Sequence, residues 1–130
     1  MRIFIDPAER IPYVLEAQRS LPPEQQIKWT FRNLSVADEM DWREELVYEW
    51  EGEGENRRAV AKDYSAWRVR FLNYTLVGWE GPGAPEFKTD LKGRPTTETT
   101  AQLHWEVAEE LLRAADEINA FRDETDAKNS

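Results

Sequence analysis

Few side chains in this 130-residue chain could perform chemistry, because it contains one His and no Cys. The absence of Cys excludes disulfides, thiol nucleophiles and Cys-based zinc sites. His104 lies beside Trp105 near the start of a predicted helix. A general base needs an orienting acid and a nucleophile or water site, and no nucleophile motif accompanies His104. We therefore interpret His104 as a surface or packing residue and expect a protein that is not an enzyme.

Clustered carboxylates and glycines suggest two further kinds of site. Glu49, Glu51, Glu53 and Glu55 alternate along the chain, but their spacing lacks the EF-hand pattern, so we expect a solvated turn and no metal. The glycine-rich segment 78–83 lacks the Lys-Ser/Thr pair of a phosphate-binding loop and opens no predicted helix. No cofactor is expected.

The charge balance bears on the partners. The chain has 26 acids and 17 bases, a formal net charge of -9, whereas phosphate binding needs an excess of Lys and Arg. Five bases between positions 57 and 70, together with Tyr64 and Trp67, imitate a basic and aromatic nucleic-acid surface. Because those two aromatics fall on a stripe that needs burial, we expect no nucleic-acid partner. No apolar window approaches the ~20 residues of a membrane span, so we expect no membrane partner and a cytoplasmic location.

Apolar periodicity predicts an α+β fold in which an N-terminal antiparallel β-hairpin packs on about three α-helices. Residues 26–32 alternate between apolar and polar, which is typical of a half-buried strand, and we pair them with residues 13–16, with 2–5 as a further candidate strand. The predicted helices cover about 35–51, 57–77 and 99–122. Ser35 with Asp38 and Glu39 is expected to cap the first helix, and Thr99 with Gln102 the third.

Helical spacing also predicts which helix faces meet. Trp67 and Phe71 are expected to be buried against a stripe of Met40, Val47 and Trp50 on the first helix. Residues 35–56 carry nine acids and one base, and residues 57–70 carry five bases and one acid. We therefore expect the acidic first helix to face the basic start of the second. Residues 1–122 are predicted to form one domain, and residues 123–130 a flexible polar tail.

Trp79 and Phe87 are the predicted partner-binding residues. They lie in the loop of residues 78–87, which holds three Gly and two Pro, and large aromatics in such positions are frequent hot spots of protein interfaces. An alternative interpretation is that Trp79 folds back and closes the core between two helices.

Several segments, taken in order, resemble small proteins encoded in the structural gene modules of tailed bacteriophages, some of which are tail assembly chaperones. The segments are Arg2-Ile3-Phe4-Ile5-Asp6-Pro7, Tyr13-Val14-Leu15-Glu16, Leu21-Pro22-Pro23-Glu24-Gln25-Gln26, Phe31-Arg32-Asn33-Leu34 and Leu76-Val77-Gly78-Trp79-Glu80. The resemblance covers residues 1–90 best. The family usually has a longer insert after the Gly-Trp loop than residues 81–85 provide.

The resemblance implies a non-enzymatic morphogenesis protein in the cytoplasm of the infected bacterial host. Its partner would be a protein, such as the tape-measure protein or a tail-tube subunit, and its oligomeric state is open. Two other functions remain alternatives. One is a structural virion component, such as a decoration or head–tail connection protein. The other is an acidic inhibitor that mimics nucleic acid towards a basic host protein.

Overall fold

The computed structural model of the chain describes residues 3–121. A three-stranded antiparallel sheet has the strand order β1-β2-β5, with β1 at Ile11–Tyr13, β2 at Lys28–Phe31 and β5 at Leu76–Glu80. The predicted N-terminal hairpin is therefore present, with a register of Ile11 opposite Phe31 and Tyr13 opposite Trp29. It is part of a larger sheet, because β2 also pairs with β5. The strand expected at residues 2–5 is not formed by residues 3–5, which are exposed.

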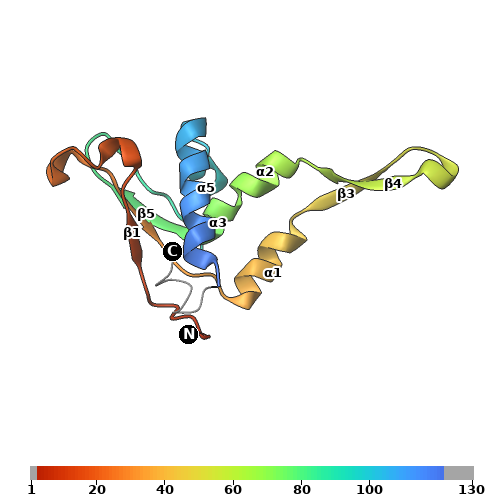
Figure 1. Cartoon of the computed structure of the whole chain (residues 1–130), viewed down its shortest axis with the longest axis horizontal. Helices are drawn as coiled ribbons and strands as arrows, with labels where there is room; N and C mark the ends of the chain where they lie inside the picture. The colour runs from red at the N-terminus through yellow and green to blue at the C-terminus, as the bar shows by residue number, and fades with distance from the viewer. Residues whose placement is uncertain (1–2, 122–130) are drawn as a thin grey trace, which may run out of the picture.

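Helices lie beside the sheet and along the chain that leads away from it (Figure 1). They are α1 (Val36–Glu44), α2 (Tyr64–Val69), α3 (Phe71–Thr75), α4 (Thr97–Thr100) and α5 (Trp105–Asn119). Short 3-10 turns occupy Glu16–Gln18, Pro23–Gln25 and Gly54–Asn56. The amphipathic α5 supplies Leu111 and Leu112 to the core, and Glu110 on the same helix accepts a 2.7 Å hydrogen bond from the Tyr13 hydroxyl of β1.

The buried side chains of the sheet, α1, α3 and α5 form one apolar cluster. Its members are Trp29, Phe31, Trp42, Phe71, Leu72, Tyr74, Leu76, Trp79, Ala108, Leu111, Leu112, Ala114 and Ala115. Leu76 and Trp79 are both buried although they are three residues apart, because the register between β2 and β5 shifts at Thr30 and Phe31. An irregularity of this kind breaks the period-2 alternation that a strand normally shows.

The first two predicted helices form only in part: α1 covers residues 36–44 of the first, and α2 and α3 cover residues 64–69 and 71–75 of the second. The chain of residues 45–63 is a β-hairpin of β3 (Val47–Glu51) and β4 (Arg58–Lys62), which extends away from the sheet and helices (Figure 1). Gly52 and Gly54 adopt φ values of 86° and 58° in its turn. A Cβ on Gly52 would lie 2.6 Å from the carbonyl oxygen of Asn56, so this turn requires glycine. We call residues 47–62 the arm.

The predicted packing stripe is also wrong, because Val47 and Trp50 lie on the arm and Met40 is exposed on α1. Met40, Val47 and Trp50 are exposed, and Trp50 retains 64% of its accessible surface. The partner of Trp67 is Trp42, whose ring stacks on it with centroids 4.1 Å apart. Phe71 is buried as predicted, whereas Trp67 is only half-buried. The expected pairing of acidic and basic segments occurs across the arm, between Lys62 and Glu49 at 2.9 Å, and between the ends of α2 and α1, where Arg70 lies 3.6 Å from Glu45.

The ends of the helices follow local capping chemistry. Ser35 caps α1 as predicted: its hydroxyl oxygen accepts a 3.1 Å hydrogen bond from the Asp38 amide. The predicted third helix is interrupted, and its predicted cap at Thr99 is wrong: Thr96 caps α4, which contains Thr99, and His104 caps α5. The polar tail predicted at residues 123–130 lies outside the described residues.

Candidate functional site

The loop after β5 encloses a small apolar pocket beside the sheet. The pocket has a volume of about 90 Å³ and is lined by Ile27, Trp29, Trp79, Gly83, Ala84, Pro85, Gln102 and Leu103. This volume exceeds the roughly 10–15 Å³ needed by one water and suits a single aliphatic side chain. We call it the Trp29–Trp79 pocket.

Two hydrogen bonds hold the loop over the pocket. The Trp79 indole Nε1–H donates a 2.7 Å hydrogen bond to the Pro85 carbonyl oxygen, and the Ala84 amide donates to the Gly81 carbonyl oxygen at 3.2 Å. Gly81 has φ 148°, and a Cβ at this position would lie 2.7 Å from the Gln26 carbonyl oxygen. Glycine therefore allows the loop to approach the chain that leads into β2.

Two indoles form one wall of the pocket. The Trp29 and Trp79 rings meet edge to face with centroids 5.4 Å apart. Trp29 is only 4% exposed, and among the described residues its Nε1–H has no hydrogen-bond acceptor. A buried donor without a partner is unfavourable by about 1–3 kcal/mol. An oxygen atom presented next to Trp29 Nε1 would relieve this penalty.

The structure places the two predicted partner-binding residues together. The Phe87 ring meets the Trp79 ring edge to face at 4.8 Å, and Phe87 is half-buried. Trp79 is 9% exposed, so its position fits the core interpretation and not that of a protruding anchor. Binding of a partner at these residues stays a prediction. Local sequence patterns do not place Trp29 and Leu103 at this loop, because they meet it only through the pairing of β2 with β5 and the turn before α5.

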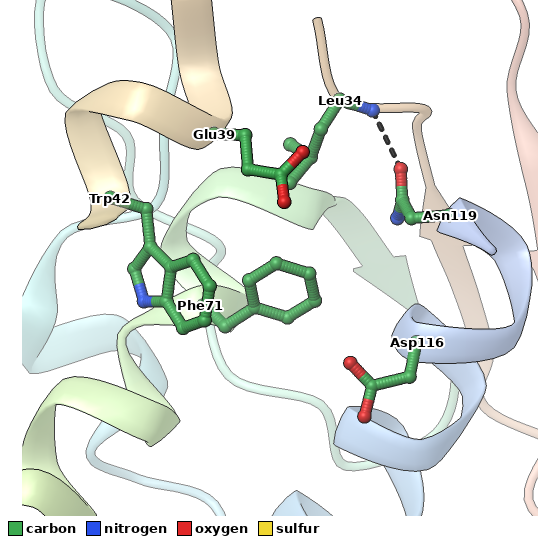
Figure 2. A pocket seen from close by; sticks show the side chains of 6 residues that line it. All are labelled: Leu34, Glu39, Trp42, Phe71, Asp116 and Asn119. Carbon is green, nitrogen blue, oxygen red and sulfur yellow. Dashed lines mark hydrogen bonds between the residues drawn. The ribbon is translucent and has the colours of Figure 1, made fainter. Parts of the chain in front are cut away.

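A second pocket, of about 180 Å³, lies between α1, α3 and α5 (Figure 2). Figure 2 shows Glu39 above the Phe71 ring and Asp116 below it. Both carboxylates already have cationic partners. Glu39 accepts a 2.8 Å contact from Arg43, and Asp116 pairs with Arg68. Asn119 Oδ1 accepts a 2.7 Å hydrogen bond from the Leu34 amide. The Glu39 pair lies within α1, and the Asp116 and Asn119 contacts join α5 to α2 and to Leu34, so we assign these polar groups structural roles.

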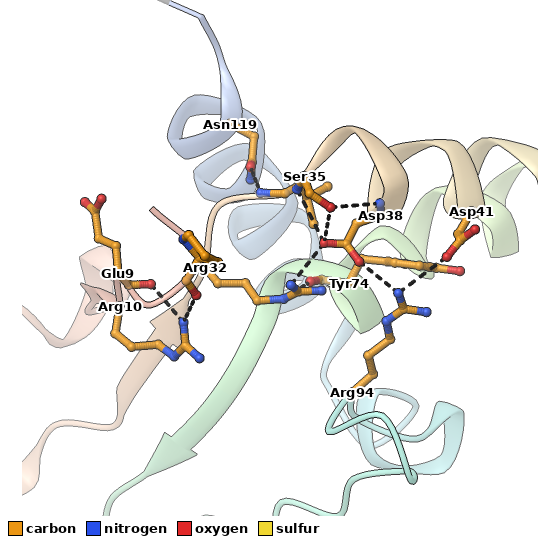
Figure 3. Close-up of polar contacts among 11 residues, drawn as sticks. Glu9, Arg10, Arg32, Ser35, Asp38, Asp41, Tyr74, Arg94 and Asn119 are labelled. Carbon is orange, nitrogen blue, oxygen red and sulfur yellow. Dashed lines mark hydrogen bonds and ion pairs between the residues drawn. The ribbon is translucent and has the colours of Figure 1, made fainter. Parts of the chain in front are cut away.

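A polar cluster around Asp38 joins α1 to the sheet and to the 86–95 loop (Figure 3). Asp38 Oδ2 lies 3.1 Å from Arg32 Nη1, and Oδ1 lies 2.9 Å from Arg94 Nη2. Arg32 Nε also donates a 2.8 Å hydrogen bond to the Tyr74 carbonyl oxygen. Since each of these groups bonds a different element, we assign the cluster a structural role.

These contacts predict a dependence of stability on pH. Burial of Asp38 is the largest influence and raises its pKa, but hydrogen bonds from Ser35, Arg32 and Arg94, with the charge of Arg32, outweigh it and hold the pKa below its ordinary value of 3.8. A carboxyl group whose pKa is lower in the folded state contributes stability above its unfolded pKa, and this contribution disappears as pH falls through the folded pKa. Urea midpoints between pH 7 and pH 3 should therefore fall less steeply for Asp38→Asn than for the wild type. Equal slopes would contradict this assignment.

The other candidate chemistries have structural explanations. His104 Nδ1 accepts a hydrogen bond from the Glu106 amide at 3.1 Å, as a helix cap. The alternating glutamates lie on β3 and in the turn of the arm. Arg57 stacks over the Trp50 ring at 4.2 Å. Within residues 3–121, no group of three or more His, Asp or Glu side chains could hold a metal ion.

Comparisons of the chain with known protein families, curated proteins and solved structures find no match. No helix in the described part of the chain has the length and apolar character to cross a membrane.

Proposed function

We propose that the protein is a non-enzymatic bacteriophage morphogenesis protein of the tail assembly chaperone type. In this function it binds an apolar segment of a tail component, such as the tape-measure protein or a tail-tube subunit. The phage setting is supported by the resemblance of residues 1–90 described above. The binding role is supported by the Trp29–Trp79 pocket, and above all by the buried Trp29 indole without an acceptor.

The pocket suits one aliphatic side chain followed by a backbone carbonyl. Its walls are the two indoles, Ala84, Pro85 and Leu103, which offer apolar contact. The Trp29 Nε1–H is a donor that a carbonyl oxygen of the bound segment would satisfy. A buried contact of this kind gives both affinity and orientation. The net charge of -9 keeps such a complex soluble while apolar surface is covered.

A charge placed at the pocket tests this function. Ala84→Glu puts a carboxylate at the apolar wall and should weaken binding to purified tail subunits at least about tenfold. Ala37→Glu is the matched control, because Ala37 is exposed on α1. Calorimetry with purified tail subunits would measure the binding of both variants. Thermal melts would show whether both variants are folded. Equal binding by the two variants would contradict the pocket assignment.

The protein content of purified virions distinguishes a chaperone from the main alternative, a structural virion component. A chaperone should bind tail subunits in lysates and be absent from purified particles. Presence in particles at a fixed stoichiometry would contradict the chaperone function and favour a structural virion component. Salt-sensitive binding to a basic host protein would instead favour the acidic inhibitor.

A further inference from the structure

The size of the Trp29–Trp79 pocket restricts the side chain that can enter it. Its volume is about 90 Å³, whereas a protein cavity that holds one benzene ring measures about 150 Å³. A Leu, Ile or Val side chain is therefore accommodated, and the ring of Phe, Tyr or Trp is not.

The pocket also restricts the charge of what it binds. Among the described residues that line it, none carries a charged side chain. An ionised carboxylate or ammonium group brought to such a site loses its hydration without gaining a partner of opposite charge, which is strongly unfavourable. The free end of a chain is therefore disfavoured, and the bound residue lies inside a segment.

Two polar side chains of the lining have unused hydrogen-bonding capacity. Trp29 is only 4% exposed, and its Nε1–H has no acceptor among the described residues. Gln102 is exposed, and its Nε2 donates to the Thr99 carbonyl oxygen at 3.5 Å, which is longer than the usual range of about 2.7–3.2 Å. Because a carbonyl oxygen only accepts, the amide nitrogen of Gln102 faces Thr99 and leaves Oε1 available as an acceptor. The lining therefore offers one donor and one acceptor.

A residue in an extended backbone presents the complementary pair. In a strand, the N–H and C=O groups of one residue bond on the same side of the chain, whereas a helix uses these groups internally. We propose that the pocket binds one internal Leu, Ile or Val residue of an extended segment. Trp29 Nε1–H donates to the carbonyl oxygen of that residue, and Gln102 Oε1 accepts its amide N–H. This inference rests on the proposed function, because the segment belongs to the tail component bound at the same pocket.

The loop of residues 81–85 adjusts as the segment enters. Trp29 Nε1 is buried, so the pocket has to widen slightly for an oxygen to reach it. A single side-chain hydrogen bond, from Trp79 to the Pro85 carbonyl oxygen, ties this loop to β5. A Cβ built on Gly83 meets no atom within 4 Å, so the loop has space for a small movement.

A blocked amino acid tests this recognition with the full chain. In an NMR titration, N-acetyl-leucine N-methylamide should move the Trp29 indole N–H resonance to lower field, because the proton gains an acceptor. The dissociation constant should lie in the millimolar range expected of so small a ligand. A Trp29 resonance that stays unchanged throughout that range would overturn the proposal.

Three related probes each change one recognised feature. The phenylalanine analogue carries a ring that is too large, N-acetyl-leucine ends in a free carboxylate, and N-acetyl-N-methyl-leucine N-methylamide lacks the amide N–H. Each should bind at least about tenfold more weakly than the leucine probe. Equal binding of any of the three would overturn the proposal.

Gln102→Met tests the acceptor separately, since Met is similar in length and has no amide. This variant should bind the leucine probe and its N-methylated form with equal affinity. Gln25→Met is the matched control, because Gln25 is exposed and does not line the pocket, and it should keep the tenfold preference. A Gln102→Met variant that also keeps this preference would overturn the assignment of Gln102.

Binding of purified tail subunits, measured in parallel, separates this inference from the proposed function. If Ala84→Glu weakens subunit binding while the leucine probe fails to bind, the pocket is the binding site and only the recognition of an extended aliphatic residue is overturned. If the leucine probe binds as expected while no tail subunit binds, the recognition is supported and the proposed function is overturned.

Discussion

Trp42→Ala should lower the free energy of unfolding by about 3–5 kcal/mol, the usual range for a buried Trp replaced by Ala. Trp42 is 9% exposed and stacks on Trp67 with an interplanar angle of 7°. The two residues also exchange hydrogen bonds. Trp42 Nε1 donates to the Trp67 carbonyl oxygen at 3.0 Å, and Trp67 Nε1 donates to the Trp42 carbonyl oxygen at 2.7 Å. The substitution removes the stack and one of these bonds, and so loosens α1 from α2.

Urea denaturation of Trp42→Ala and Trp105→Ala would measure this difference. Trp105 is 57% exposed, so its replacement by Ala should change the midpoint little. Trp42→Phe adds a finer comparison, since it keeps an aromatic ring but loses the indole N–H and part of the ring packing. A midpoint for Trp42→Ala close to that of Trp105→Ala would contradict the packing of α1 on α2.

The sequence predicts the N-terminal hairpin because β2 keeps a simple alternation. Trp29 and Phe31 are buried, and Lys28 and Thr30 face outward or lie half-buried. Ser35 is likewise predictable, since a capping box needs only residues three apart. Both features depend on local chemistry, which a pattern of a few residues contains.

The residues of the arm also fit helical spacing, and the sequence therefore predicts the ends of two helices there. Val47 and Trp50 are three apart, but in the structure they lie on opposite faces of β3. The correct signal was the alternation of Val47, Glu49 and Glu51 with Tyr48 and Trp50, followed by two glycines. β3 and β4 contain no buried residue, so the apolar side chains in this part of the sequence do not indicate a core face.

β5 was missed for a different physical reason. Leu76 and Trp79 are buried at a spacing of three, which imitates a helix, because the register shift opposite Thr30 and Phe31 adds a residue. The sequence predicts a loop from residue 78, but Trp79 lies on β5 and the loop begins only after Glu80. The pairing that brings Trp29 beside Trp79 is not predicted. A contact between residues fifty positions apart depends on tertiary structure, and local periodicity does not contain it.

Trp79→Ala should lower the free energy of unfolding by about 3–5 kcal/mol, because the indole is a buried wall between Trp29 and Phe87. The substitution also removes the hydrogen bond to the Pro85 carbonyl oxygen, which holds the loop over the pocket. Binding of a tail subunit should fall mainly through loss of the folded loop.

Two further variants separate the ring from its hydrogen bond. Trp79→Phe retains an aromatic ring and loses the bond to Pro85, a net contribution of about 0.5–1.5 kcal/mol, together with part of the packing. Phe87→Ala removes the half-buried ring that covers Trp79 and should have a smaller effect than Trp79→Ala. Melts and binding isotherms for the three variants under folding conditions would rank them. If Trp79→Ala keeps the wild-type melting temperature while binding falls at least about tenfold, Trp79 is an exposed interface anchor and its place in the core is wrong.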